Sequence, residues 1–198
     1  MDIKQQSTRY DLGYRLLHWV MAFLFVLMLL AGQGFASATT EADRLVMLTG
    51  HSSIGSLVII LLLIRLTKRF VIRSPRPVHP LPSAQRAAAL TMQYALYLCM
   101  IAIPVTGILT AQQHELAVNV FGTFNLSNAS VDGYSESTFM SMRSLHESAV
   151  SSFKLLLIGH IGAALFHGFV KKDGVLRSMW FKRNKKQRQA DVQKRRAL

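Results

Sequence analysis

The chain has 198 residues, of which 51% are hydrophobic and only 17% are charged, yet its formal net charge is +13. Soluble domains carry about 25% charged residues and disordered basic chains hold far fewer apolar ones, so the charges here must be segregated from an apolar bulk. The single cysteine, Cys99, excludes a disulfide framework and a cysteine-ligated iron–sulfur cluster. Length and composition together predict one compact membrane domain.

Four long apolar segments follow one another along the chain. They run from Leu16 to about Ala36, from Leu45 to Ile64, from Ala87 to about Ala111, and from about His146 to Val170. Each is long enough to cross a bilayer as a helix at ~1.5 Å per residue. We expect Pro104 to kink the third helix rather than end it, because neighbouring helices can satisfy the freed carbonyl. The predicted fold is all-α, an integral membrane four-helix bundle over residues 1–180, followed by a disordered basic tail over 181–198.

Basic residues predict the orientation of these helices. The N-terminal arm, the loop after the second segment and the tail after the fourth together hold 20 of the 23 lysines and arginines. By the positive-inside rule, both termini are cytoplasmic. The tail could also bind anionic lipid or nucleic acid, but a solvated anchor is the interpretation we favour, with membrane lipids and no nucleic acid as partners. The basic start and Ala36-Ser37-Ala38 also resemble a cleavable signal peptide, although the long first segment favours a retained helix.

Five of the seven histidines lie in or at the ends of the predicted membrane helices. They are His18, His51, His146, His160 and His167. Ionisable side chains in a membrane are costly and are functional candidates by default. The other two, His79 and His114, fall in loops and are interpreted as solvated.

The spacing of these histidines restricts which of them can share a metal. His146 and His160 share one helix face but are roughly 21 Å apart along its axis. Two imidazole nitrogens on one metal are about 4 Å apart, from bonds of roughly 2 Å. Matching by depth therefore pairs His18 with His160 near the inner surface and His51 with His146 near the outer surface. Two such pairs in a helix bundle suit two bis-imidazole haems and electron transfer, whereas zinc or copper sites would need further ligands.

Several short motifs resemble the bacterial cytochrome b561 family of membrane haem b proteins. The motifs are Arg15-Leu-Leu-His18-Trp19, His51 with Gly55 and Arg65-Leu66, Tyr97 with Pro104-Val-Thr-Gly107, and His146-Glu147, Gly159-His160, His167 and Asp173-Gly174-Val175-Leu176-Arg177. The resemblance covers residues 9 to 180. It implies two haem b groups ligated by His18/His160 and by His51/His146, in agreement with the depth argument.

The resemblance also implies a function in the bacterial inner membrane. Some members of the family pass electrons from periplasmic superoxide to ubiquinone, as superoxide:ubiquinone oxidoreductases. In that type a histidine at the position of His167 lies near the quinone. The short outer loops fit this type, and the expected partners are a quinone and a small periplasmic electron donor such as superoxide. The alternative is a cytochrome b subunit that only relays electrons for a partner dehydrogenase or hydrogenase.

Some positions depart from the family's usual residues, and two charges inside the membrane need an explanation. The departures are Gly168, Gln93, Ser52 and Val118, where relatives often carry histidine, histidine, lysine and tryptophan, respectively. Arg65 lies 14 residues after His51, at the depth of the inner haem. It is predicted to bind a haem propionate or a quinone, or else to snorkel to the surface. Lys154 is expected either to contact the outer haem or to snorkel outward.

Overall fold

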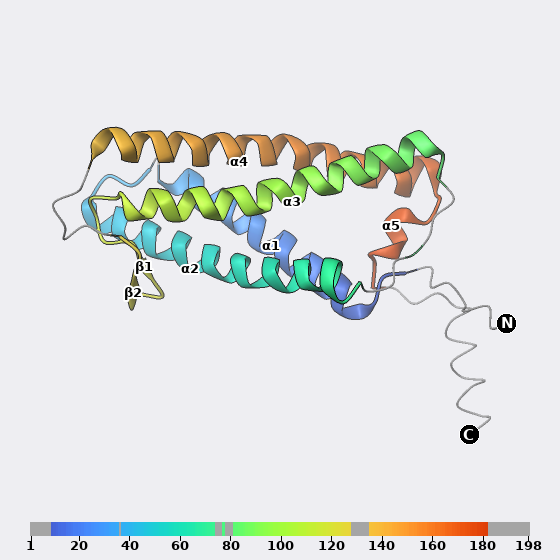
Figure 1. Ribbon diagram of the computed structural model, residues 1–198, viewed down its shortest axis with the longest axis horizontal. Coiled ribbons are helices and arrows are strands. Elements are labelled where there is room, and N and C mark those ends of the chain that lie inside the picture. The colour runs from blue at the N-terminus through green and yellow to red at the C-terminus, as the bar shows by residue number, and fades with distance from the viewer. Residues whose placement is uncertain (1–8, 36, 74–76, 78–80, 128–134, 182–198) are drawn as a thin grey trace, which may run out of the picture.

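The computed structural model describes residues 9–35, 37–73, 77, 81–127 and 135–181. Four long helices dominate it (Figure 1). They are α1 (Leu12–Gly34), α2 (Glu41–Leu66), α3 (Ser83–Gln112) and α4 (Glu136–Leu165). Each is long and apolar enough to cross a membrane, so the predicted all-α membrane bundle is confirmed. The predicted tail falls almost wholly outside the described residues.

Polar side chains fix where the helices begin. The Asp11 carboxylate accepts the Tyr14 N–H at 2.8 Å at the start of α1. Thr40 and Asp43 form a reciprocal capping box at the start of α2. Such caps satisfy backbone donors that have no partner within the helix. Ser135 caps α4 roughly three turns before its predicted start, because a helix continues past its apolar segment when a cap is available further out.

Two helix pairs make up the bundle. Helix α1 packs against α2 and α3 packs against α4, whereas α2 and α3 touch little. All four helices contribute to a buried apolar core, which contains Leu17, Met21, Leu62, Tyr97, Met100 and Phe153. The Phe25 and Phe153 rings lie 4.8 Å apart at its centre. Phe153 is seven residues from both His146 and His160, so this core separates the two histidine depths. Large apolar side chains cover much of the outer surface, as lipid-facing helices require.

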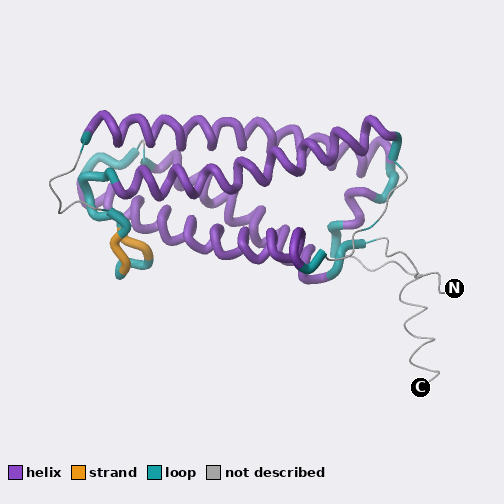
Figure 2. The backbone as a smooth tube through the Cα atoms, in the orientation of Figure 1, coloured by secondary structure: helices purple, strands orange, loops and turns teal. Residues whose placement is uncertain are grey.

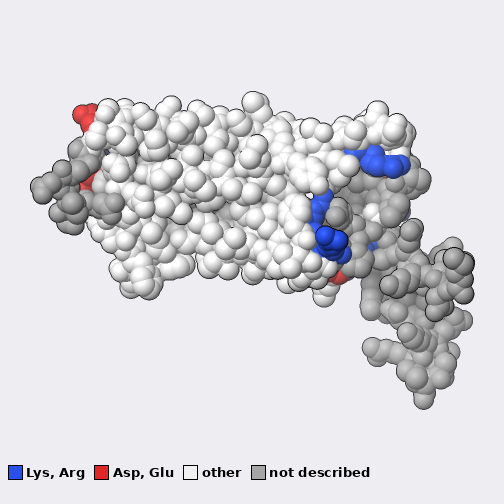
Figure 3. Space-filling view, viewed as in Figure 1, with Lys and Arg blue, Asp and Glu red and all other residues white. Residues whose placement is uncertain are grey.

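The two ends of the bundle differ in charge. At one end α1 begins, α2 and α4 run into the π-helical segments η1 (Thr67–Val71) and η2 (Phe166–Lys171), and the short α5 (Val175–Ser178) follows. Lysine and arginine side chains gather at this end in Figure 3, and we call it the basic end. At the opposite end a β-hairpin projects beside α2 in Figure 2, and we call it the hairpin end.

The hairpin is a feature that the apolar pattern did not predict. It pairs β1 (Asn119–Val120) with β2 (Phe124–Asn125) in antiparallel register. Between the strands, Phe121 and Gly122 have φ of 52° and 71°, a left-handed backbone that suits a tight turn. The Ser52 hydroxyl of α2 donates to the Asn119 carbonyl at 2.7 Å, and the Phe121 N–H donates to Ser53 Oγ at 2.7 Å. Two serines of α2 thus hold the hairpin against the bundle.

Candidate haem and quinone sites

Four histidines form two pairs, and the two members of each pair face each other across the bundle. The rings of His18 on α1 and His160 on α4 have centroids 6.3 Å apart, and their planes cross at 76°. The rings of His51 on α2 and His146 on α4 have the same separation and the same angle. The structure therefore brings together the two pairs that depth predicted, one toward each end of the bundle. His167 joins neither pair.

The spacing within each pair suits a metal held between two imidazoles. Metal–nitrogen bonds of roughly 2 Å, with each nitrogen about 1.1 Å from its ring centre, give centroids about 6.2 Å apart. Within the described parts of the chain, no third histidine, cysteine or carboxylate joins either pair as a possible metal ligand. Two facing imidazoles without a third protein ligand are the donor set of a haem iron, whose other four ligands come from the macrocycle. The residues present therefore fit haem at both depths.

Neighbours on α3 hold His146 in place. Its Nδ1 donates to the Ile103 carbonyl at 3.0 Å, and Thr106 Oγ1 lies 3.2 Å from the same nitrogen. A carbonyl can only accept, so Nδ1 carries the proton and Nε2 keeps the lone pair that a metal needs. A Cβ on Gly107 would lie only 3.1 Å from His146 Cε1, so glycine is needed here for close approach. These contacts account for Thr106 and Gly107 of the Pro104-Val-Thr-Gly107 motif.

His51 has a different environment from its partner. Its Nδ1 is buried and, among the described residues, has no hydrogen-bond partner. The Phe35 ring lies edge-on at 5.6 Å and is the aromatic group packed against it. The two imidazoles at the hairpin end are thus held differently, one by hydrogen bonds and the other by packing.

Arg65 lies at the basic end, close to the pair of His18 and His160. Its Nε donates to the Tyr97 hydroxyl at 3.3 Å, and its guanidinium lies 5.7 Å from the centre of the Tyr14 ring. Its positive charge lies close enough to His18 and His160 to interact electrostatically with both imidazoles. A boundary arginine that only snorkelled would point outward, whereas Arg65 is half-buried against two tyrosines.

His167 forms a hydrogen-bonded pair with Asp173. His167 Nδ1 lies 2.5 Å from Asp173 Oδ2, and the Val175 N–H donates to the other carboxylate oxygen at 3.2 Å. Burial raises the pKa of Asp173, but the hydrogen bonds from His167 and Val175 outweigh it, so the pKa lies below its ordinary value. The carboxylate therefore stays ionised and fixes His167 through Nδ1, which leaves Nε2 for a ligand.

A cavity of about 400 Å³ opens beside His167 at the basic end. Its lining is mainly apolar and aromatic, with a few cationic groups: Trp19, Leu165, His167, Gly168, Phe169, Lys172, Gly174, Leu176, Arg177 and Trp180. Hydrogen bonds from α1 fix its far wall, because Trp19 Nε1 donates to the Met179 carbonyl and Arg15 Nη1 to the Trp180 carbonyl, both at 2.9 Å. The cavity's volume falls within the range of small-molecule sites, and its lining places the imidazole of His167 among apolar and aromatic side chains. The sequence suggested His167 but not this wall, which exists only once α5 folds back onto α1.

The residues that depart from the family's usual pattern have structural roles in this fold. Gln93 Oε1 accepts a hydrogen bond from Arg69 Nη2 at 3.3 Å, and Ser52 holds the hairpin. A side chain at Gly168 would overlap Leu176 of α5, so glycine lets α5 close over the cavity. Val118 is 4% exposed, and its carbonyl accepts the Leu126 N–H next to the hairpin. Lys154 is exposed on the outer face of α4, which removes it from the bundle interior and from the outer histidine pair.

The chain matches one known protein family over most of its length. A family model described as prokaryotic cytochrome b561 matches residues 9–182. The chain belongs to the prokaryotic cytochrome b561 family. Two relatives from Escherichia coli (strain K12) agree with this assignment. Cytochrome b561 homolog 2 is 28% identical over 185 residues, covering 90% of this chain and 95% of the relative. Cytochrome b561 homolog 1 is 30% identical over 165 residues, covering 82% and 92%. The expected resemblance is confirmed, and the chain is a membrane cytochrome of an electron-transfer family.

Proposed function

We propose that this protein carries two haem b groups and transfers electrons across the bacterial inner membrane, from a periplasmic donor such as superoxide to ubiquinone. The observation that carries the proposal is the pair of facing imidazoles at each end of the bundle, both with centroids 6.3 Å apart. His18 and His160 would hold one haem, and His51 and His146 the other. When bound, the haems supply one-electron redox chemistry, and a bis-histidine iron has no open position for oxygen.

Charge supports the membrane orientation that the proposal requires. The basic end faces the cytoplasm by the positive-inside rule, which puts the hairpin end in the periplasm. A donor would meet the pair of His51 and His146 first. Two superoxide anions that each give up one electron and leave as O₂ supply the two electrons that reduce one quinone to quinol, and two protons then enter from the cytoplasm.

The cavity beside His167 supports the quinone part of the proposal. It lies at the same end as the pair of His18 and His160, and its aromatic walls suit a flat ring. Asp173 holds the imidazole through Nδ1, so Nε2 is the nitrogen left to bond a quinone carbonyl. Lys172 and Arg177 add positive charge, which would favour the electron-rich reduced ring.

Haem ligation is tested with purified protein in lipid nanodiscs. Wild type should show the absorbance of reduced haem b, and His18→Ala and His51→Ala should each lose one haem and keep the other. His114→Ala is the matched control, because His114 packs on Phe139 outside both pairs. Wild-type protein without haem absorbance, or full haem content in both variants, would contradict the proposal.

The reaction is tested by rapid mixing with superoxide while the haem spectrum is followed. Reduction should be fast, and added short-chain ubiquinone should reoxidise the haems in wild type but more slowly in His167→Ala. If superoxide leaves the haems oxidised, while a co-purifying dehydrogenase or hydrogenase reduces them, the relay function is correct instead.

A further inference from the structure

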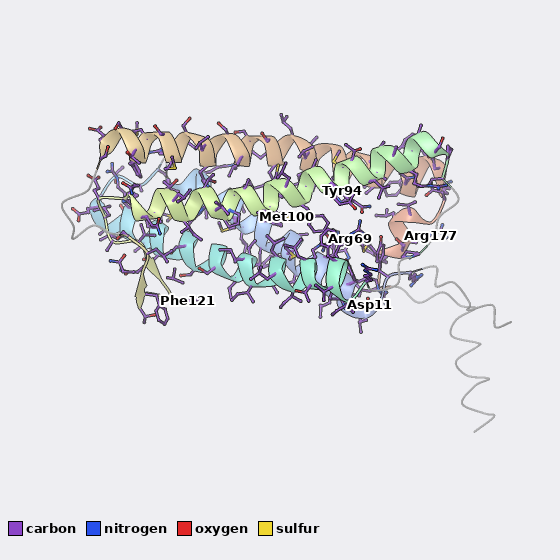
Figure 4. The ribbon with its side chains drawn as sticks, viewed as in Figure 1. Asp11, Arg69, Tyr94, Met100, Phe121 and Arg177 are labelled. Carbon is purple, nitrogen blue, oxygen red and sulfur yellow. The ribbon has the colours of Figure 1, made fainter. Side chains whose placement is uncertain are left out.

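Arg69 is a buried cation just beyond the end of α2. Its side chain is among the most buried polar groups of the described chain, with the residue 6% exposed. Its contacts are with neutral groups: Nη2 donates to Gln93 Oε1 at 3.3 Å, and its guanidinium lies 6.0 Å from the Phe70 ring centre and 5.9 Å from that of Tyr94. Figure 4 shows Arg69 beside Tyr94 of α3. These contacts satisfy part of its hydrogen bonding but leave its charge uncompensated.

Arg65 brings a second guanidinium to the same region. It lies one helical turn before Arg69 and contacts the rings of Tyr14 and Tyr97 at 5.7 and 5.9 Å. The charges of both arginines act electrostatically on the Tyr14 hydroxyl, and the Tyr97 side chain lies near it. Two cations and two phenols therefore lie in one region of the basic end, which we call the arginine–tyrosine cluster (Tyr14, Arg65, Arg69, Tyr97).

Within the part of the chain that the structure describes, no carboxylate forms an ion pair with Arg65 or Arg69. The ion pairs found there join Lys68 to Asp11, Arg143 to Glu147 and His167 to Asp173. A buried guanidinium without an anion is strongly unfavourable, because desolvation is not offset by a counter-charge. The cluster is thus built for an anion that the protein itself does not supply.

The position of the cluster beside His18 and His160 indicates which anion it binds. Tyr14 lies one turn before His18 on α1, so both side chains are on one face of the helix. The charge of Arg65 acts on both His18 and His160. A haem b between these imidazoles carries two propionate carboxylates, and guanidinium groups bind carboxylates in a charge-assisted, bidentate manner. We propose that Arg69, with Arg65 and the Tyr97 hydroxyl, binds a propionate of the haem at the basic end. This inference rests on the proposed haem ligation by His18 and His160.

The test is a redox titration of the haem-loaded protein in nanodiscs, comparing Arg69→Gln with wild type. Loss of the buried positive charge should make the midpoint potential of one haem more negative, because reduction adds an electron next to a propionate that is no longer neutralised. The affected haem should be the one that His18→Ala removes. Arg69→Lys should shift the same potential less, since lysine keeps the charge but lacks the planar guanidinium that binds a carboxylate through two hydrogen bonds. Arg73→Gln is the matched control, an exposed arginine four residues further on and beyond the end of η1, and should leave both potentials unchanged.

The outcomes separate the possible failures. Potentials in Arg69→Gln equal to those of Arg73→Gln would overturn this inference and leave the proposed function standing. Unchanged potentials with less co-purified anionic phospholipid would assign the cluster to a lipid phosphate and overturn it equally. Wild type without haem at His18 and His160 would overturn both proposals before any arginine variant is made. If Arg69→Gln does not fold, Arg69→Lys and Arg65→Gln must shift the same potential, or the inference is wrong.

Discussion

At the hairpin end, α3 fixes His146 by a backbone carbonyl and a threonine, and the Phe35 ring packs against His51. At the basic end, arginines and tyrosines surround the pair of His18 and His160, and a cavity opens beside it. The two pairs have the same ring separation and angle. Two haems with the same ligands but different surroundings would have different reduction potentials, because charges and hydrogen bonds near a metal tune its potential.

The largest expected effect comes from filling the space above His146. Gly107→Val should displace the imidazole, because even a Cβ would approach Cε1 to 3.1 Å. Haem content should fall to roughly half, with the haem at the basic end retained, since overpacking acts locally. Quantitative haem analysis measures this, with Gly32→Val as the control, because nothing lies within 4 Å of a Cβ there. Loss of both haems would mean that the two ends are not independent.

A glycine-to-valine substitution at the basic end should disturb the cavity beside His167 rather than a histidine pair. Gly168→Val should push Leu176 and α5 away from α4 at a cost of about 1–3 kcal/mol. Both haems should remain, while haem reoxidation by ubiquinone slows. The chain's two tryptophans, Trp19 and Trp180, pack with ring centres 5.5 Å apart, so their fluorescence reports the displacement. Unaltered quinone reaction with displaced α5 would place the quinone elsewhere.

A pH effect of intermediate size should be confined to the basic end. The folded-state pKa of Asp173 lies below the unfolded value of 3.8. Its hydrogen bonds therefore stabilise the protein above pH 3.8, and this contribution is lost as the pH falls through the lower folded value. Tryptophan fluorescence should show an acid transition in wild type that Asp173→Asn lacks and that Glu136→Gln, an exposed carboxyl at the hairpin end, retains. An identical transition in all three proteins would exclude Asp173 as its origin.

The smallest effect is expected at the hairpin. Ser53→Ala removes the acceptor for the Phe121 N–H and should destabilise hairpin docking by about 1 kcal/mol. Hydrogen exchange of the hairpin should rise, while both haem potentials stay unchanged. Ser152→Ala is a suitable control, because that hydroxyl bonds only its own helix at Ser148. A changed potential would show that the hairpin supports the His51 site directly.

Much of this molecule follows from its sequence alone. Apolar segments of sufficient length fix the four helices, because a bilayer requires backbone groups to be satisfied within each span. The 14-residue interval between His146 and His160 fixes two depths, because a helix rises by a constant amount per residue. Together these facts predict which histidines pair, although depth alone did not tell that Lys154 lies exposed on the outer face of α4.

Tertiary structure decided the surroundings of each pair. The Ile103 carbonyl is an ordinary backbone group until α4 brings His146 against it. Arg69 is one of many basic residues near a helix end, and only packing against α3 buries it without a counter-charge. The cavity beside His167 depends on α5 returning to α1, and no local pattern encodes that contact. Helix formation and depth depend on local periodicity, whereas burial, hydrogen-bond partners and cavities depend on which distant segments meet.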